Sequence, residues 1–339
     1  MAKDIRIGIV GCGRIATVEH APALSHLQGV RLAAFCDIVK SKREHFRDTF
    51  APAAELFSSF PAMLKADLDA VVVSVPNYLH CRMTLAALKA GLHVLCEKPM
   101  AGNLADATKM VAAARRAHRI VHVNQSLRYS RFHTAIADLI RKGSIGNPIH
   151  IRCIRGHGTT PDKGWSPGAK WFVSRKAQGG VIFDIGVHMA DMLQWWFGRV
   201  DEISAVVSTR TPGIDVPDHV ASVFRFNNGA TGILELSWAM PTGAGLVEIY
   251  GTKGSIRAGF GEKPIELTTL MDGKATTSYP DLTPSHPTSQ EAFVAAIRRT
   301  GRTLSPAELG FDAVALCEAI ARAGATGKAV KVRHCAKQK

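Results

Sequence analysis

Three groups of residues have side chains whose types and spacing suit catalysis or cofactor binding. Lys98 follows directly on a short apolar stretch that has the pattern of a buried strand. Asp184, His188 and Asp191 share one helix pattern, and a glycine-rich turn begins at Gly11. Together these groups could supply a positive charge, a proton acceptor and a binding site for phosphate.

The stretch HVLCEKPM predicts a strand over residues 93–96 that ends just before Lys98. The same arrangement precedes Ser74 and Asn77, which follow the apolar run at residues 70–73. Open parallel sheets bind ligands at the carboxyl ends of their strands. These side chains are therefore expected at the rim where a ligand binds.

The stretch GGVIFDIGVHMADMLQWWFG predicts a helix over residues 179–198. Asp184, His188 and Asp191 stand at i, i+4 and i+7, which places them on one helix face. Flanking carboxylates would orient the imidazole and adjust its basicity. The same spacing could hold a metal ion, but a third protein ligand is not evident, so no metal is expected.

The stretch IRIGIVGCGRIATVEHAPAL indicates a strand, a glycine turn and a helix. Gly11 permits the tight turn, and Gly13 leaves no side chain between the backbone and a bound pyrophosphate. Ala16 is the third small residue, which lets helix and strand pack closely, and the helix N-terminus offers N–H groups to phosphate. The pattern predicts a dinucleotide site.

Asp37 ends the next strand pattern, VRLAAFCD, 26 residues after Gly11. An acid there can accept hydrogen bonds from both hydroxyls of an adenosine ribose and would repel a 2′-phosphate. This favours NAD over NADP. Lys40, Lys42 and Arg43 follow closely and could still hold a 2′-phosphate, so NADP stays possible.

Strand and helix patterns alternate through the first part of the chain, from Ile5 to Gln125. Alternation at this length predicts a doubly wound parallel sheet. We therefore expect an α/β protein whose residues 1–126 form a Rossmann dinucleotide-binding domain.

From residue 127 onward the pattern changes to strands in succession. The turn at 227–229 and the pair Thr252-Lys253 predict hairpins, and the last strand expected there covers residues 254–260. Residues 127–339 are expected to form an α+β domain with an open, mostly antiparallel sheet for substrate binding and oligomerisation. One sheet face should carry helices, and the other could form a subunit interface.

Composition narrows the class of protein. The chain has 339 residues, with 46% hydrophobic and 21% charged residues, as in a globular protein large enough for two domains. The net charge is +14, but the basic residues are spread out, so an anionic cofactor or substrate is expected and nucleic acid is not. No long apolar stretch predicts a membrane span. Seven scattered cysteines and the absence of a secretion-signal pattern indicate a cytoplasmic protein.

These motifs resemble those of the glucose–fructose oxidoreductase and inositol dehydrogenase (Gfo/Idh/MocA) family. GIVGCGRIA is similar to its nucleotide turn, and VPNYLH with AALKAGLHVLCEKPM resembles its central signature. GGVIFDIGVHMADMLQWW resembles the signature of its second domain, and the likeness covers roughly residues 4–332. The resemblance implies a Rossmann domain, an open α/β domain, and a homodimer or homotetramer formed through the sheet.

The resemblance also implies roles for individual residues. The catalytic residues would be Lys98, Asp184 and His188. Residues around the cofactor would be Gly11, Gly13, Arg14, Ile15, Asp37, Ser74, Pro76, Asn77, His80, Glu97, Lys98 and Gln125. Residues that contact the substrate would be Lys98, His188, Asp191, Trp165 and Arg155, the last two in the glycine- and proline-rich loop RGHGTTPDKGWSPGAKWF.

The expected reaction is the reversible oxidation of a secondary alcohol on a sugar, cyclitol or related polyol with NAD. His188 would take the hydroxyl proton, Asp184 would orient the imidazole, and Lys98 would stabilise the developing alkoxide. Three alternatives stay open: an NADPH-dependent reductase of keto-sugars, a glycoside-cleaving enzyme that uses NAD transiently, and a non-catalytic sugar sensor.

Overall fold

The computed structural model describes residues 3–259, 261–282 and 287–336. The chain divides into two compact units. The first holds the described residues up to Ser126 together with Pro287–Phe311, and the second holds the remainder. Phe260 at the end of an expected strand, and the terminal residues of both expected domains, lie outside the described residues.

The first unit is built on a six-stranded parallel sheet with the order β3-β2-β1-β4-β5-β6. The strands are β1 (Ile5–Val10), β2 (Val30–Cys36), β3 (Glu55–Phe57), β4 (Ala70–Val73), β5 (His93–Cys96) and β6 (Val121–Val123). The order reverses between β1 and β4, which is the switch point at which doubly wound sheets bind dinucleotides. The predicted Rossmann fold is confirmed.

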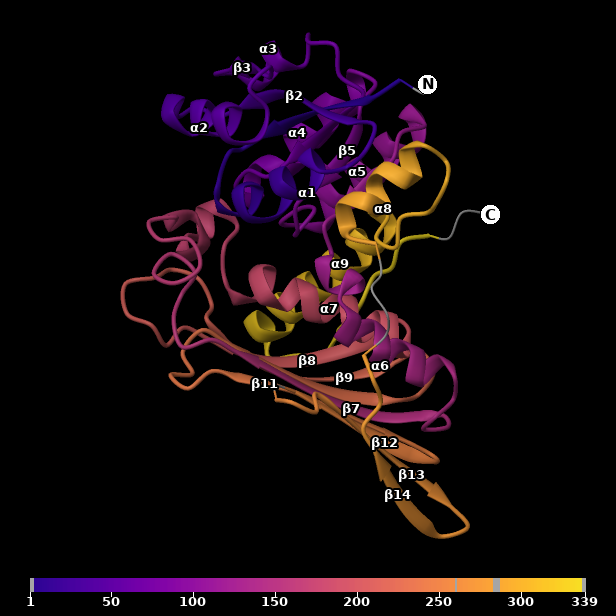
Figure 1. The fold of residues 1–339 in the computed structure, drawn as a ribbon. Helices are drawn as coiled ribbons and strands as arrows, with labels where there is room; N and C mark the ends of the chain where they lie inside the picture. The colour runs from indigo at the N-terminus through magenta and orange to yellow at the C-terminus, as the bar shows by residue number, and fades with distance from the viewer. Residues whose placement is uncertain (1–2, 260, 283–286, 337–339) are drawn as a thin grey trace. The chain divides into compact units, whose positions relative to one another are not determined.

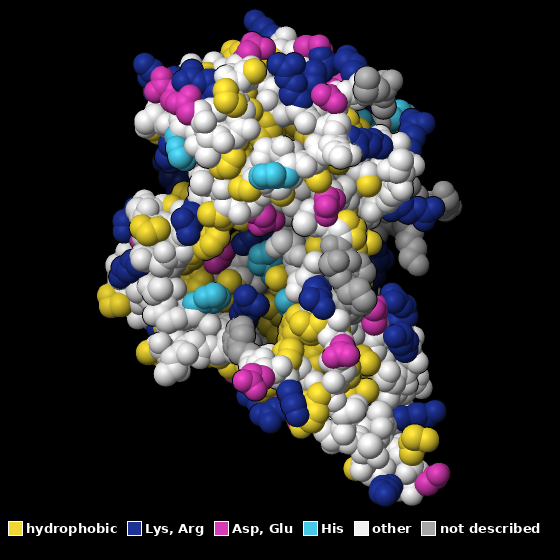
Figure 2. All heavy atoms as spheres, in the orientation of Figure 1, with side chains coloured by type: hydrophobic (Ala, Val, Ile, Leu, Met, Phe, Trp, Pro, Cys, Tyr) yellow, Lys and Arg dark blue, Asp and Glu magenta, His cyan; other side chains and the backbone are white. Residues whose placement is uncertain are grey.

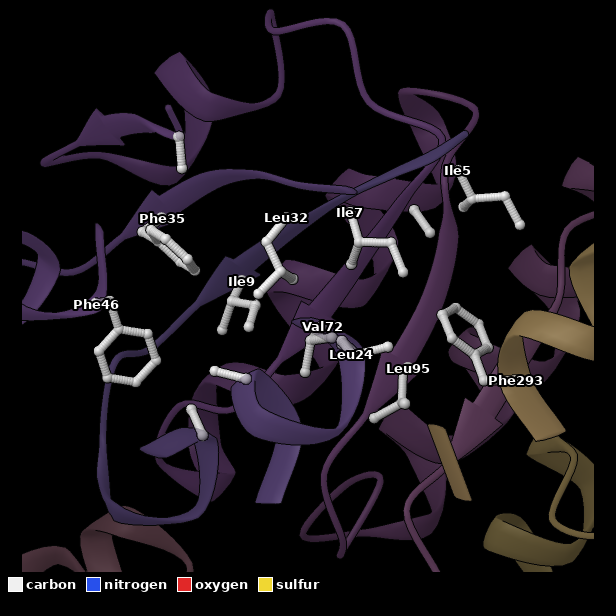
Figure 3. Close-up of a cluster of buried hydrophobic side chains, with 14 of the residues drawn as sticks. Ile5, Ile7, Ile9, Leu24, Leu32, Phe35, Phe46, Val72, Leu95 and Phe293 are labelled. Atoms are coloured by element: carbon white, nitrogen blue, oxygen red, sulfur yellow. The ribbon is translucent and has the colours of Figure 1, made fainter. Parts of the chain in front are cut away.

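One hydrophobic core of the first unit lies on one face of this sheet (Figure 3). Ile7 and Ile9 of β1 alternate toward it, and Phe46 and Phe293 pack against them with at most 1% of their surface exposed. The helices of this unit are η1 (Ala16–His20), α1 (Ala21–Ser25), α2 (Lys40–Phe50), α3 (Phe60–Met63), α4 (Asn77–Lys89), α5 (Leu104–Ala117) and α8 (Ser289–Ile297). Because β4 and β5 are buried on both faces, they read as continuous apolar runs.

Helix α8 belongs to the first unit although its sequence lies far beyond residue 126 (Figure 1). Its Phe293 joins the core, and it contacts α1. The side chain of Thr288 caps the helix through a capping box with Glu291. The expectation that residues 127–339 form one domain does not include this return, because chain order alone does not reveal it.

The second unit contains a nine-stranded sheet with the order β14-β13-β12-β11-β7-β10-β9-β8-β15. Its strands are β7 (Pro148–Gly156), β8 (Val200–Ser208), β9 (His219–Phe226), β10 (Thr231–Ser237), β11 (Ala244–Gly251), β12 (Gly254–Gly259), β13 (Ile265–Met271), β14 (Lys274–Ser278) and β15 (Val330–Lys331). Only β7 and β10 pair in parallel among these described strands. The predicted open, mostly antiparallel sheet is confirmed, including both hairpins.

Helices cover one face of this second sheet (Figure 1). They are α6 (Arg131–Arg141), η5 (Ile182–Gly186), α7 (Val187–Phe197) and most of α9 (Ala307–Thr326), and short 3₁₀ turns occur at η2 (Ser126–Tyr129), η3 (Lys170–Val173) and η4 (Arg175–Ala177). A methyl group on Gly186 would crowd Leu236 of β10, and one on Gly324 would overlap Val207 of β8. The helices therefore pack closely on this face.

Charged side chains of both signs are mixed on one face of the protein. In the face seen in Figure 2, Lys and Arg are interspersed with Asp and Glu among the described residues, with no continuous basic stripe. None of the described helices is both long enough and apolar enough to cross a membrane.

Candidate active site

The glycine turn after β1 has the geometry that its sequence predicted. Gly11 has φ +91°, and a side chain there would overlap the carbonyl oxygen of Ser74. Gly13 is different, because a Cβ placed on it would meet no heavy atom within 4 Å. Arg14 is exposed and Ile15 is half-buried at the start of the following helix. Gly11 thus permits close strand packing, and Gly13 leaves room for a ligand.

Asp37 lies beside this turn and fixes its backbone. One carboxylate oxygen accepts from the N–H of Cys12 at 2.9 Å, and the other accepts from the N–H of Val39 at 2.8 Å. Arg43 donates to the Asp37 carbonyl oxygen at 3.0 Å. Each carboxylate oxygen has a further lone pair, so Asp37 can hold the turn and still accept from a ribose.

The turn after β4 is held by side chains predicted to contact the cofactor. Ser74 donates to the carbonyl of Gly11 at 2.8 Å, and the two ring nitrogens of His80 lie 2.7 Å from the carbonyls of Val75 and Pro99. Burial lowers the pKa of His80. Pro76 directly precedes α4, which begins at the buried Asn77. Ser74 and His80 therefore position the turns after β4 and β5, and cofactor contact by these residues stays a prediction.

Glu97 and Lys98 follow β5 at the carboxyl edge of the same sheet. Glu97 is buried, whereas Lys98 is half-buried. Burial raises the pKa of Glu97, but hydrogen bonds from His20 and Asn124 and the charge of Lys98 outweigh it, so the net pKa lies below the usual value. The first unit thus places a fixed carboxylate next to the predicted catalytic lysine.

Gln125 is the strongest sign of a ligand at this edge. Its side chain is 1% exposed, and neither its Oε1 nor its Nε2 has a hydrogen-bond partner within the described part of the chain. A buried amide left in this way is costly unless a ligand or water completes it. With the open space at Gly13 and the acid at Asp37, the residues present fit a dinucleotide.

The helix that carries Asp184 and His188 begins with a π-helical turn, η5, before it continues as α7. Both side chains are half-buried. The π-turn changes the predicted regular spacing, and such turns are frequent at functional sites.

Asp191 differs from this pair because it is only 2% exposed. Its two oxygens accept from Arg128 Nε at 2.6 Å and from Arg128 Nη2 at 2.8 Å. The guanidinium also lies 5.0 Å from the ring centroid of Trp195. Burial raises the pKa of Asp191, and Arg128 opposes that rise. Asp191 therefore does not share an accessible polar helix face with Asp184 and His188 as expected, because its side chain is buried and paired with Arg128.

Arg155 stands at the start of the predicted substrate loop in the second unit, and Trp165 lies within that loop. Arg155 is half-buried near the end of β7, and burial followed by its charge lowers the pKa of His133 to about 4. Trp165 is 47% exposed. Asp162 orders the loop by accepting from Thr160 at 2.6 Å and from Lys170 at 2.7 Å. Substrate contact by Arg155 and Trp165 stays a prediction.

Four residues that contact the candidate site residues, or the partners of those residues, were not predicted from the sequence. They are His20, Arg128, Ser289 and Gln290. Each becomes visible only through a partner more than sixty positions away, so no local pattern marks it. The described residues contain no group of three or more His, Cys, Asp or Glu side chains that could hold a metal ion.

Both halves of the chain match known families. Residues 5–125 match "Oxidoreductase family, NAD-binding Rossmann fold", and residues 133–257 match "GFO/IDH/MocA C-terminal domain". A 1,5-anhydro-D-fructose reductase of Ensifer adhaerens is 36% identical over 273 residues, which cover 78% of this chain and 80% of that protein. The chain belongs to the Gfo/Idh/MocA family.

Other members of the Gfo/Idh/MocA family are similar over most of the chain. A myo-inositol 2-dehydrogenase of Thermotoga maritima is 27% identical, covering 79% of this chain and 78% of that protein. The crystal structure of the WlbA dehydrogenase of Bordetella pertussis, in complex with NADH and UDP-GlcNAcA, has a TM-score of 0.85 at 25% identity. The match covers 98% of this chain and 99% of that one. These comparisons confirm the predicted fold. They also confirm the prediction that the chain is an oxidoreductase with an NAD-binding unit.

Proposed function

We propose that this protein transfers a hydride, reversibly, between NAD and a secondary alcohol of a sugar, cyclitol or related polyol. The observation that carries the proposal is the carboxyl edge of the first sheet. There a glycine turn open at Gly13, the acid Asp37 and the buried amide of Gln125, which has no partner among the described residues, fit a dinucleotide. Family membership supports the substrate class, since the relatives described above are named for a sugar-derived ketone and for an inositol.

The proposed chemistry divides between three side chains. NAD, when bound, supplies the hydride acceptor. His188 takes the hydroxyl proton as the carbon–hydrogen bond breaks, so that the alcohol becomes a ketone and the imidazole holds the proton. Asp184 orients the imidazole, and Lys98 stabilises negative charge on the reacting oxygen. The sequence resemblance supports this joint assignment.

The substrate is proposed to contact Arg155, Trp165 and the region around Asp191. An aromatic ring and a guanidinium suit the apolar faces and the hydroxyls of a sugar, and a guanidinium also suits a carboxylate or a phosphate. The WlbA structure supports including acidic sugars, because its named ligand is one.

The test is a panel of polyols with each cofactor. The purified protein is incubated with myo-inositol, D-glucose, D-xylose, D-glucuronate or glucose 6-phosphate, with NAD⁺ or NADP⁺, and reduction is followed by absorbance. Lys98→Ala and His188→Ala are each expected to lower kcat by about 10²-fold or more. His188→Ala removes a general base, and Lys98→Ala removes a group that stabilises developing charge. NAD⁺ binding should persist in both variants. Turnover near that of the wild type in either variant would contradict the assigned roles.

A reductase acting on keto-sugars with NADPH is the second candidate function. The relative from Ensifer adhaerens, whose name is that of a reductase, favours it. The same panel run in reverse, with 1,5-anhydro-D-fructose and NADH or NADPH, separates the two. Faster turnover in reduction and with NADPH would favour the reductase.

We also propose a homodimer or homotetramer formed through the uncovered face of the second sheet. Val206 and Val223 on this face are 71% and 59% exposed. Beside them, Arg152 lies 3.3 Å from Glu235 and 3.8 Å from Glu248. Apolar side chains next to alternating charges suit a two-fold interface, in which the same surface meets itself.

Light scattering of the purified protein measures its molecular mass and so tests the proposed oligomer. Val206→Asp and Val223→Asp are expected to reduce the mass toward one chain. Met271→Asp, at a residue that is 72% exposed on β13, is the matched control and should leave the mass unchanged. A wild-type protein of monomer mass would contradict the proposal.

The cytoplasmic location also stays a proposal, supported by seven cysteines that are not joined in disulfides.

A further inference from the structure

The carboxylate of Glu97 is the end point of a buried hydrogen-bond network in the first unit. Its Oε1 lies 2.6 Å from Asn124 Nδ2 and 2.8 Å from His20 Nε2, and its Oε2 accepts from the N–H of Lys98 at 3.2 Å. Glu97 is 6% exposed, Asn124 2% and His20 0%. An ionised carboxylate can only accept hydrogen bonds, so His20 must donate from Nε2.

Helix α8 supplies the next residues of the network. Ser289 donates to Asn124 Oδ1 at 2.6 Å, which fixes the side-chain amide with its NH₂ toward Glu97. Gln290 Nε2 lies 2.9 Å from His20 Nδ1. An amide nitrogen can only donate, so this contact keeps the hydrogen of the ring on Nε2. Two adjacent residues of α8 thereby set the orientation of both side-chain donors to Glu97.

The network continues behind Ser289. His122 Nε2 lies 2.8 Å from the Ser289 hydroxyl, and Thr303 lies 2.8 Å from His122 Nδ1. Burial lowers the pKa of His122 to about 3, so this ring is neutral near pH 7. It then donates to Ser289 and accepts from Thr303. The hydrogen bonds described here all run toward Glu97, and the amides of Asn124 and Gln290 also donate to Glu19 Oε1 at 3.1 and 3.2 Å. A series of hydrogen bonds aligned in this way strengthens the last one.

We propose that Ser289 and Gln290, acting through Asn124 and His20, are positioning residues that hold the Glu97 carboxylate ionised and fixed beside Lys98. The inference rests on the proposed function, in which Lys98 acts on the substrate. A displaced or neutral Glu97 would remove a fixed negative charge next to the lysine. The loss would then appear in turnover more than in cofactor binding.

The titratable groups near Glu97 come from each neighbouring element. They are Glu19 and His20 of η1, His80 of α4, Cys96 of β5, Lys98, and His122 of β6. Among these, His20 and Lys98 stabilise the charged carboxylate. Weakening the donors to Glu97 should therefore raise the pH at which it takes up a proton.

The test compares Ser289→Ala and Gln290→Met with the wild type. Each variant is expected to lower kcat about tenfold and to move the acid limb of the kcat profile upward by about one pH unit, as the loss of a hydrogen bond to a charged group would. The KM for NAD⁺ should stay within about twofold. Ser289→Thr, which keeps the hydroxyl, should restore both kcat and the profile.

Ser222→Ala is the matched control, because Ser222 is 3% exposed and its hydroxyl donates to Leu234 in the second sheet. It should lower the melting temperature to a similar degree without moving the pH profile. If Ser289→Ala and Gln290→Met keep the wild-type profile while Lys98→Ala is inactive, the positioning roles are wrong and the proposed function stands.

A second measurement does not depend on finding a substrate. Carbon-13 NMR of labelled glutamate carboxyl groups, with the Glu97 signal assigned through Glu97→Gln, follows its titration in wild type and in Ser289→Ala. A midpoint that rises in the variant supports the inference even if no polyol in the panel is oxidised. An unchanged midpoint overturns it.

Discussion

Asp37 combines a structural and a proposed functional role in one side chain. Its oxygens hold the N–H groups of Cys12 and Val39, and the resemblance assigns it to the ribose of NAD. The neighbouring Arg43 donates to the Asp37 backbone carbonyl, and Lys40 and Lys42 are exposed. If the carboxylate is neutralised, these neighbouring cationic side chains could hold a 2′-phosphate.

Asp37→Asn should weaken NAD⁺ binding and improve NADP⁺ binding. The amide keeps an acceptor for the turn but removes the negative charge that repels a 2′-phosphate and one acceptor for the ribose. We expect the Kd for NAD⁺ to rise about tenfold and the ratio of the two Kd values to shift toward NADP⁺. Calorimetric titration with each cofactor measures both. An unchanged ratio would show that Asp37 does not select the cofactor.

His122 makes stability depend on pH through its burial. Its folded pKa is about 3, against 6.5 for an exposed imidazole, so the unfolded chain binds a proton at this position between those pH values. Stability from this group is complete above pH 6.5 and is lost as the pH falls. Between pH 7.5 and 5 the loss should be about 2 kcal/mol.

Urea unfolding of the wild type and of His122→Gln at the two pH values isolates this contribution. The variant should lose about 2 kcal/mol less on acidification, whatever its stability at pH 7.5. His45→Gln, at an exposed histidine, is the control and should follow the wild type. Equal losses in all three proteins would mean that His122 is already protonated, or exposed, in the native state.

Arg128 connects two elements, since it lies in η2 and pairs with Asp191 in α7. The two side chains are 5% and 2% exposed, so neither charge has water as an alternative partner. Removing one member of a buried pair leaves the other uncompensated, whereas replacing both with apolar groups costs much less. The pair therefore fixes where α7 lies against η2.

Arg128→Met should destabilise the protein by about 3–5 kcal/mol, and Arg128→Met/Asp191→Leu should recover most of that loss. The deficit of the single variant should shrink at low pH, because burial already raises the pKa of Asp191 and a protonated carboxyl needs no counterion. Denaturant unfolding at pH 7 and pH 5 measures both effects. A double variant as unstable as the single one would show that packing, and not the charge, is responsible.

The same double variant separates structure from substrate contact. If Asp191 touches the substrate, the restored fold should still show a raised KM. A double variant with normal stability and normal KM would remove Asp191 from the proposed substrate contacts.

Local sequence predicted which helices and strands are present, but it did not predict the detailed geometry of each one. Apolar runs such as residues 70–73 and the turn at 227–229 predicted strands and a hairpin that the structure contains. The π-turn at Ile182–Gly186 was not predicted, because a shift of one residue in hydrogen bonding leaves the apolar pattern nearly unchanged. That shift matters for the site, since it alters how Asp184 and His188 are presented.

At the scale of the whole molecule, the features that sequence could not predict are contacts between residues far apart in the chain. The roles of Gln125 and Asp37 could be proposed because each stands beside a strand end in a recognisable motif. Ser289 and Gln290 stand at the start of an ordinary amphipathic helix, and their partners Asn124 and His20 are 165 and 270 positions away. Only the fold brings them together.

The return of α8 to the first unit predicts that residues 1–126 do not form a stable domain alone. Phe293 of α8 is fully buried in the core of that unit, and losing an aromatic side chain from a core costs about 3–5 kcal/mol. A fragment ending at residue 126 should therefore unfold at low urea and bind NAD⁺ weakly. The same fragment joined by a flexible linker to residues 287–311 should regain a cooperative transition. Circular dichroism during urea unfolding and NADH fluorescence test this, with Phe293→Ala in the joined fragment as the matched control. Equal stability of the short and the joined fragments would show that the six-stranded sheet is self-sufficient, and that α8 only adds side chains to it.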